Sequence, residues 1–181
     1  MRYLRERLLA RSSDLLETLQ VEAWLEQPGL PDNAPRSESE ALSRVRQQGA
    51  QWARGQLSSA SLEADVWTTQ EWLHFLRSLP AKLASGQLVD LDGAFALTAV
   101  GNAEIAHEWL LIAIKNEYEP AYPRLESYLV EIGRRKLIVP LYDELLTTDA
   151  GRQRARAIYE RACPGYHPIV TSSLDAVLAH H

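Results

Sequence analysis

Three consecutive cations, Arg134, Arg135 and Lys136, form the part of this sequence that is best suited to bind a ligand. A guanidinium group can hold a carboxylate through two parallel hydrogen bonds, and an ammonium group adds a compact positive charge. The run lies between two amphipathic segments and follows Gly133, where we predict a left-handed residue that closes a helix. Two interpretations stay open at this point. The cations either cap the last carbonyl groups of the preceding helix, or point into a neighbouring groove.

The sequence contains none of the local signatures of a self-contained catalytic site. His107 begins a stretch like the zinc motif H-E-x-x-H, but Leu111 stands where the second histidine is needed, so we interpret His107 as a structural residue. There is no G-x-S-x-G elbow and no glycine-rich phosphate loop. We interpret Cys163, the single cysteine, as a buried structural thiol, and His167 as a capping or packing residue. We therefore expect no catalytic residue and no metal ligand in this chain.

The bulk composition favours one globular domain, or one domain plus a fragment. The chain has 181 residues, 46% of them hydrophobic, and a net charge of -5, which gives no electrostatic case for binding nucleic acid or an anionic membrane. The first residues have no secretory pattern, and no apolar run approaches the ~20 residues of a membrane span. A single cysteine fits a reducing compartment, so we predict a cytoplasmic protein. His180 and His181, which could belong to a tag, carry none of the functional argument.

The elements that would position the cations are all predicted to be helices. We expect one helix over residues 2–19 and a short one over 21–25, after which residues 28–31, Pro-Gly-Leu-Pro, form the clearest boundary in the chain. A capping box at residues 37–40 would start the next helix, which carries Leu42, Val45, Gly49 and Trp52 on one face.

Later helices have clearer start and stop signals. Residues 68–71, Thr-Thr-Gln-Glu, predict a capping box flanked by Trp67 and Trp72 as a hydrophobic staple, and Pro80 ends that helix. A helix over 88–97 is weakened by a glycine. Asn102 is the predicted N-cap of the following helix.

The remaining helices repeat one apolar template, with spacings of three and four residues, at short intervals. The positions are Leu125, Tyr128, Leu129 and Ile132; then Ile138, Leu141, Tyr142 and Leu145; then Ala155, Ile158, Tyr159 and Ala162; with a final helix over 169–178. Each helix is too short to be stable alone. Stacked antiparallel helices would share one continuous core, as in a helical solenoid.

Several stretches, collinear along most of the chain, together resemble the C-terminal part of the leukotriene A(4) hydrolase family of bifunctional zinc aminopeptidases. The resemblance is strongest from Trp67 onwards and weak over residues 34–64. The stretches that carry it are Trp24-Leu25 with Pro28-Gly29-Leu30-Pro31, Asn102-Ala103-Glu104-Ile105 with Trp109-Leu110, Gly133-Arg134-Arg135-Lys136 with Pro140-Leu141-Tyr142, and His167-Pro168.

This resemblance implies an all-α fold, a two-layer armadillo/HEAT-like α-α superhelix of antiparallel helices. Residues 1–31 would be the helical tail of a catalytic domain with a linker, and residues 32–181 the C-terminal helical domain. The zinc-binding H-E-x-x-H of the family is absent from this sequence. We therefore expect no cofactor in this chain, zinc in a catalytic domain of the same polypeptide, and no activity of the chain alone, either as a fragment or as a stand-alone relative.

The resemblance also implies different roles for the three cations. By position it implies that Arg134 and Lys136 bind the carboxylate of a peptide substrate, whereas Arg135 fills a variable position and is solvated. The sequence departs from the family pattern at residues 137–139, and hydrolysis of a lipid epoxide is not implied. The alternative is a stand-alone helical-repeat module that binds another protein and needs no catalytic half.

Overall fold

The computed structural model describes residues 3, 6–7, 15, 18–34 and 39–179, and every regular element in these ranges is a helix. The chain divides into two compact units, residues 1–39 and residues 40–181. The helix predicted over residues 2–19 and the capping box predicted at 37–40 fall largely outside the described residues. The assignment of residues 1–31 to a catalytic domain stays a prediction.

The described part of the first unit is built around one short helix, α2 (Val21–Glu26), which begins after Gln20 in the left-handed conformation with φ 49°. The Trp24 indole donates a hydrogen bond to the Asn33 side chain at 3.1 Å, and the Asn33 amide donates to the carbonyl of Thr18 at 3.2 Å. These bonds hold the segment after α2 against it. The predicted break at residues 28–31 is confirmed, because α2 ends at Glu26.

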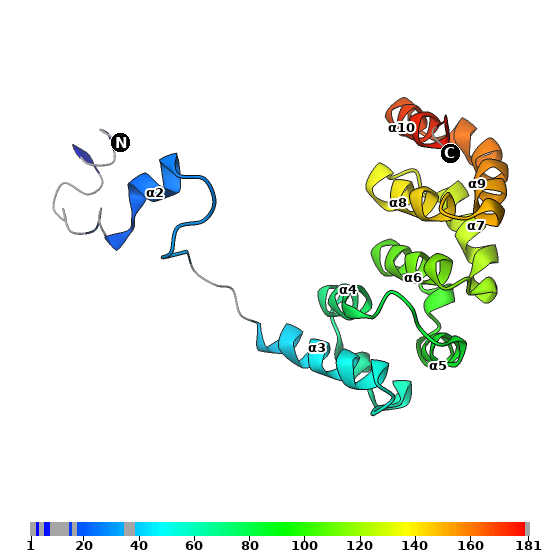
Figure 1. Ribbon diagram of the computed structural model, residues 1–181, viewed down its shortest axis with the longest axis horizontal. Coiled ribbons are helices and arrows are strands. Elements are labelled where there is room, and N and C mark those ends of the chain that lie inside the picture. Colours follow the sequence, from blue (N-terminus) through cyan, green and yellow to red (C-terminus); the bar gives the residue numbers. More distant parts are fainter. Residues whose placement is uncertain (1–2, 4–5, 8–14, 16–17, 35–38, 180–181) are drawn as a thin grey trace. The chain divides into compact units, whose positions relative to one another are not determined.

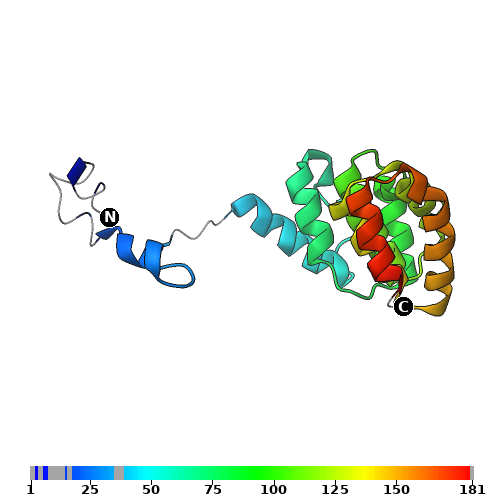
Figure 2. The ribbon, with the colours of Figure 1, turned by 90° about the horizontal axis from the view of Figure 1, so that it is seen from above.

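The second unit is an all-helical repeat superhelix. Figure 1 shows α4, α6, α8 and α10 stacked as one layer, with α5, α7 and α9 forming the other, and Figure 2 shows the same unit from above. Contacts join α4 to α6, α6 to α8, α8 to α10 and α7 to α9. The helices are α3 (Glu40–Ala53), α4 (Thr69–Ser78), α5 (Ser85–Phe95), α6 (Ala103–Lys115), α7 (Tyr122–Glu131), α8 (Arg135–Leu145), α9 (Asp149–Ala162) and α10 (Pro168–Ala179).

The core runs between the two layers and is rich in aromatic side chains whose polar ends are satisfied. The Trp109 indole donates to the Thr98 hydroxyl at 3.0 Å. The Tyr128 hydroxyl donates to the carbonyl of Ala103, the first residue of α6, at 2.8 Å, and burial raises the Tyr128 pKa to about 12. Large buried side chains therefore contribute apolar area without leaving a polar group unpaired. The Tyr128 bond also ties α7 to the start of α6.

Local signals placed most helix ends correctly. The capping box at Thr68 is present, with the Thr68 N–H donating to the Glu71 carboxylate at 2.8 Å. The rings of Trp67 and Trp72 meet edge to face with centroids 5.1 Å apart, as the staple predicts. Asn102 caps α6 through bonds from two backbone N–H groups. The helix predicted over 88–97 instead spans Ser85–Phe95, because the chain turns at residue 96 with φ 49°.

The turn from α8 to α9 is tighter than a side chain would allow. Thr148 caps α9 by accepting a hydrogen bond from the Gly151 N–H at 3.1 Å. A Cβ atom added to Gly151 would overlap the backbone carbonyl oxygen of Leu145 and lie 2.8 Å from the Thr148 hydroxyl. Gly151 is therefore required here by close backbone approach, although its φ is not positive.

Candidate functional site

The cationic run lies at the start of α8. Helix α7 ends at Glu131, and the chain continues in extended conformation through Ile132 to Arg134, the N-cap of α8. Gly133 does not have a positive φ, so the prediction of a left-handed C-cap is wrong. Only Ile132 and two more residues separate the helices, and the chain needs an extended path to reach the next layer. Arg135 and Lys136 belong to the first turn of α8.

The three cations bond across to other helices. Arg134 Nη1 donates to Glu104 Oε1 at 3.1 Å, and Lys136 Nζ donates to Glu104 Oε2 at 3.4 Å. Arg135 Nε donates to the Ser173 hydroxyl of α10 at 2.8 Å. The interpretation that these cations cap the carbonyl groups of the preceding helix is therefore wrong. The structure brings Arg134 and Lys136 together on one carboxylate and directs Arg135 elsewhere.

Glu104 is the residue that sequence reasoning missed. It lies in the first turn of α6, where its charge is favourable to the helix dipole. Its ion pairs span 30 and 32 residues, which no local pattern predicts. Sequence patterns could have indicated only that the two helix starts share an edge. Alternate helices of an antiparallel stack run in the same direction, so the N-termini of α6 and α8 should lie at the same edge.

The cluster formed by Glu104, Arg134 and Lys136, hereafter the Glu104 cluster, carries one net positive charge. The side chains of Arg134 and Lys136 are each 63% exposed, whereas that of Glu104 is 30% exposed. The N-terminal ends of α6 and α8 add partial positive charge. Arg134 is the N-cap residue of α8, but its side chain makes no capping hydrogen bond to that helix. Cations in the first turn of α8 are unfavourable to its dipole, and Glu104 offsets this. Because the pairs are exposed, each contributes little to stability, typically ~0.2–1 kcal/mol.

A buried histidine fixes the first turn of α8. His107, one turn after Glu104 on α6, is 8% exposed and donates through Nδ1 to the Leu137 carbonyl at 2.7 Å. Burial lowers the His107 pKa, and this outweighs the opposite effect of the Leu137 bond. Pro140 lies inside α8 and has no N–H for the carbonyl four residues earlier, Lys136, which weakens this turn internally. Contacts from α6 therefore position the turn that carries the cations.

The other residues singled out in the sequence have structural roles. His107 is confirmed as a structural residue, and His167 as a cap, since its Nδ1 accepts a hydrogen bond from the Ile169 N–H at 3.2 Å. Cys163 is half-buried, so the prediction of a buried thiol is wrong. Within the described ranges no three His, Cys, Asp or Glu side chains gather as a metal site would require. No helix there is long and apolar enough to cross a membrane.

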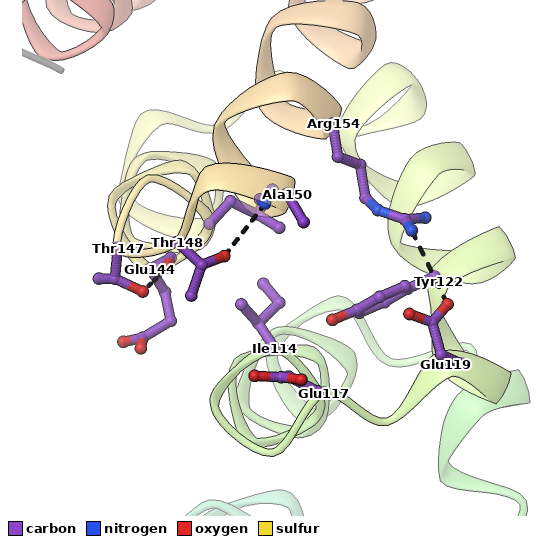
Figure 3. Close-up of a pocket in the computed structure, with 11 residues that line it drawn as sticks. Ile114, Glu117, Glu119, Tyr122, Glu144, Thr147, Thr148, Ala150 and Arg154 are labelled. Atoms are coloured by element: carbon purple, nitrogen blue, oxygen red, sulfur yellow. Dashed lines mark hydrogen bonds and ion pairs between the residues drawn. The ribbon is translucent and has the colours of Figure 1, made fainter.

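A hollow of about 140 Å³ lies at the opposite ends of these helices and is drawn in Figure 3. Its one cation, Arg154, lies 4.2 Å from the centre of the Tyr122 ring and pairs with the Glu119 carboxylate at 3.7 Å. The pocket is also lined by Thr148 and Gly151, the residues that form the α9 cap. Arg154, Thr148 and the Gly151 N–H are thus used in internal contacts, and the Glu104 cluster remains the candidate site.

Fold and site together define an all-helical repeat domain with paired cations at one edge. Residues 67–178 match the family described as leukotriene A4 hydrolase, C-terminal. The match includes Glu104, Arg134 and Lys136. The chain belongs to this family.

Named relatives are much longer than this chain. It is 29% identical over 145 residues to leucine aminopeptidase 2 of Pyricularia oryzae, covering 78% of this chain and 23% of that protein. It is 23% identical over 175 residues to human aminopeptidase B, covering 92% of this chain and 27% of that protein. The chain thus spans about a quarter of the length of the curated relatives it matches. It is similar to a C-terminal domain of aminopeptidases.

Proposed function

We propose that this chain is the non-catalytic C-terminal helical domain of a zinc-dependent aminopeptidase, and that Arg134 and Lys136 bind the carboxylate of its peptide substrate. Family membership and the aminopeptidase relatives support the first part. One observation carries the second: both cations already bond a single carboxylate, that of Glu104. These bonds support the proposal because the C-terminal group of a peptide is also a carboxylate and could bond the same two cations.

The domain division follows from this proposal. Residues 1–31 would be the tail of the catalytic domain and its linker, and residues 32–181 would wall one side of the substrate cleft. Zinc would be held by the catalytic domain, since the zinc motif H-E-x-x-H is absent from this sequence. The cytoplasm is the location we propose, in keeping with the single cysteine.

The two cations would act by positioning. The Arg134 guanidinium can bind a carboxylate through two hydrogen bonds, and Lys136 adds a point charge. Holding the carboxylate of a short peptide would fix how far its amino end reaches towards the catalytic domain. A positioned substrate reacts faster, since the entropy of alignment is lost on binding and not in the reaction. Arg135 would take no part, because it bonds Ser173.

The test uses the polypeptide that joins this chain to a catalytic domain. Reading the gene upstream of Met1 should reveal an open frame with H-E-x-x-H. In that enzyme, Arg134→Ala should cost ~1.5–3 kcal/mol, the value for a charged hydrogen bond, as a lower kcat/KM for peptides with a free carboxylate. The same peptides with a carboxamide should be unaffected.

Arg135→Ala is the matched control, since it removes the same charge from the same helix turn and should leave the kinetics unchanged. Equal effects of Arg134→Ala on the acid and the amide would refute the carboxylate role. This chain alone should not hydrolyse aminoacyl anilides. Metal-dependent turnover by it would refute the non-catalytic assignment, and a start codon with no upstream domain would favour a stand-alone interaction module.

A further inference from the structure

Glu104 binds both cations of the proposed carboxylate site while leaving most of their hydrogen-bond donors unused. Its Oε1 accepts from Arg134 and its Oε2 from Lys136, one bond each. A guanidinium group has five N–H donors and an ammonium group has three. We propose that Glu104 is a specificity-determining residue, which keeps the pair at one net positive charge and so favours ligands with one carboxylate over ligands with two. This inference rests on the proposed function of Arg134 and Lys136.

Burial shows which side of the cluster remains open. The Glu104 side chain is 30% exposed and lies at the start of α6, whereas Arg134 and Lys136 are each 63% exposed. The internal carboxylate therefore occupies the inner side of the two cations, and their outer side faces solvent. A ligand can approach from that side and bond both cations without displacing Glu104. The substrate's carboxylate would then be a second anion on the same pair.

The charges decide which ligand fits. Two cations and one carboxylate carry one net positive charge, which a single carboxylate neutralises. A peptide that ends in Asp or Glu brings a second negative charge, which is repelled by Glu104 and has no third cation on this carboxylate, because Arg135 bonds Ser173 of α10 instead. Two unit charges about 7 Å apart in a medium as polar as water change a binding ratio about threefold. Glu104 would impose at least that preference.

Position in the fold supports this role over simple stabilisation. Exposed ion pairs contribute little to stability. Glu104 also has a favourable place in the first turn of α6, whichever partner it binds. His107 already fixes the first turn of α8 through the Leu137 carbonyl. The turn thus has its own anchor, and what Glu104 adds is charge.

The experiment titrates this chain with three acetylated dipeptides and follows the backbone amide signals of residues 134–137 by NMR. The probes are acetyl-Ala-Ala with one negative charge, acetyl-Ala-Asp with two, and acetyl-Ala-Ala-amide with none. Salt is kept near ~10 mM so that screening stays weak. The wild-type chain should bind acetyl-Ala-Ala more tightly than the amide. Glu104→Gln should shift the Kd ratio of the two acids about threefold or more towards acetyl-Ala-Asp, and Glu104→Asp should retain the wild-type ratio.

Glu108→Gln is the matched control. It removes the same charge from α6, but from a carboxylate that pairs with Arg77 at 2.6 Å, and it should leave the ratio unchanged. An unchanged ratio in Glu104→Gln, or equal changes for both acids, would mean that Glu104 only supports structure and would overturn the inference. If the wild-type chain binds the amide as well as the acid, the carboxylate site itself fails, and the inference fails with it.

Discussion

Replacing His107 by leucine tests how α6 positions the first turn of α8. The substitution keeps most of the side-chain volume but removes the donor that bonds the Leu137 carbonyl at 2.7 Å. Loss of one such bond costs ~0.5–1.5 kcal/mol, and more if the carbonyl is left without water. We therefore expect the free energy of unfolding at pH 7.5 to fall by about 1 kcal/mol or somewhat more.

The same substitution should change the pH dependence of stability. Burial, opposed by the Leu137 bond and by Glu108, holds the pKa of folded His107 below its ordinary value near 6.5. Just below that pH the unfolded chain binds more protons than the folded chain. The contribution of neutral His107 to the free energy of unfolding is therefore complete above about pH 6.5 and is lost as the pH falls through the pKa of the folded state. His107→Leu has no such contribution to lose. The stability gap between the two proteins should narrow from pH 7.5 to pH 5.5.

Urea unfolding at both pH values measures this gap, with the denaturant slope expected to stay constant. His107→Asn is the informative companion, because its amide can donate a similar hydrogen bond without titrating. It should be closer to the wild type than His107→Leu at pH 7.5 and should lack the histidine's pH dependence. A gap that stays constant or widens as the pH falls would refute the account of His107 as a buried neutral donor.

Two further pairs of substitutions test the starts of α9 and α4. Gly151→Ala should destabilise the fold by roughly 1–3 kcal/mol in urea unfolding, because its Cβ would overlap the Leu145 carbonyl. Gly93 is an exposed site in α5 where an added Cβ meets no neighbour within 4 Å, so Gly93→Ala should instead stabilise by ~0.5–1 kcal/mol. Equal effects at the two glycines would contradict the close approach at Gly151. Thr68→Ala should cost ~1 kcal/mol by removing the N-cap of α4, whereas Thr68→Ser should restore most of it; a neutral Thr68→Ala would show that the cap does not contribute.

The sequence predicts those structural features that depend on interactions between residues close to one another in the chain. A cap such as Asn102 and a stop such as Pro80 act within a few residues, so their roles follow from residue type and spacing. Gly133 was predicted wrongly because glycine permits a left-handed cap but does not require one. Whether it adopts that conformation depends on where the next helix must begin.

The partner of the cations could not be predicted in this way. Glu104 is about 30 residues from Arg134 and Lys136, and only the stacking of α6 on α8 brings them together. Sequence patterns indicate that the helices alternate in direction, and hence which helix ends share an edge. They do not indicate which side chains meet there. Resemblance to a family assigned the cations a ligand, but it did not reveal that the chain supplies a carboxylate of its own.

The stacking of α4, α6, α8 and α10 also determines which helices of the second unit should unfold locally most easily. Contacts join helices that are close in the sequence, so each helix depends on its immediate neighbours, as in a one-dimensional array. Opening then costs least at the outer helices, which have a neighbour on one side only, and most in the interior. Helices α6 and α8 are interior. The paired cations are therefore carried by helices whose internal amide hydrogens should exchange slowly, and fraying at either end of the array should leave the distance between them unchanged.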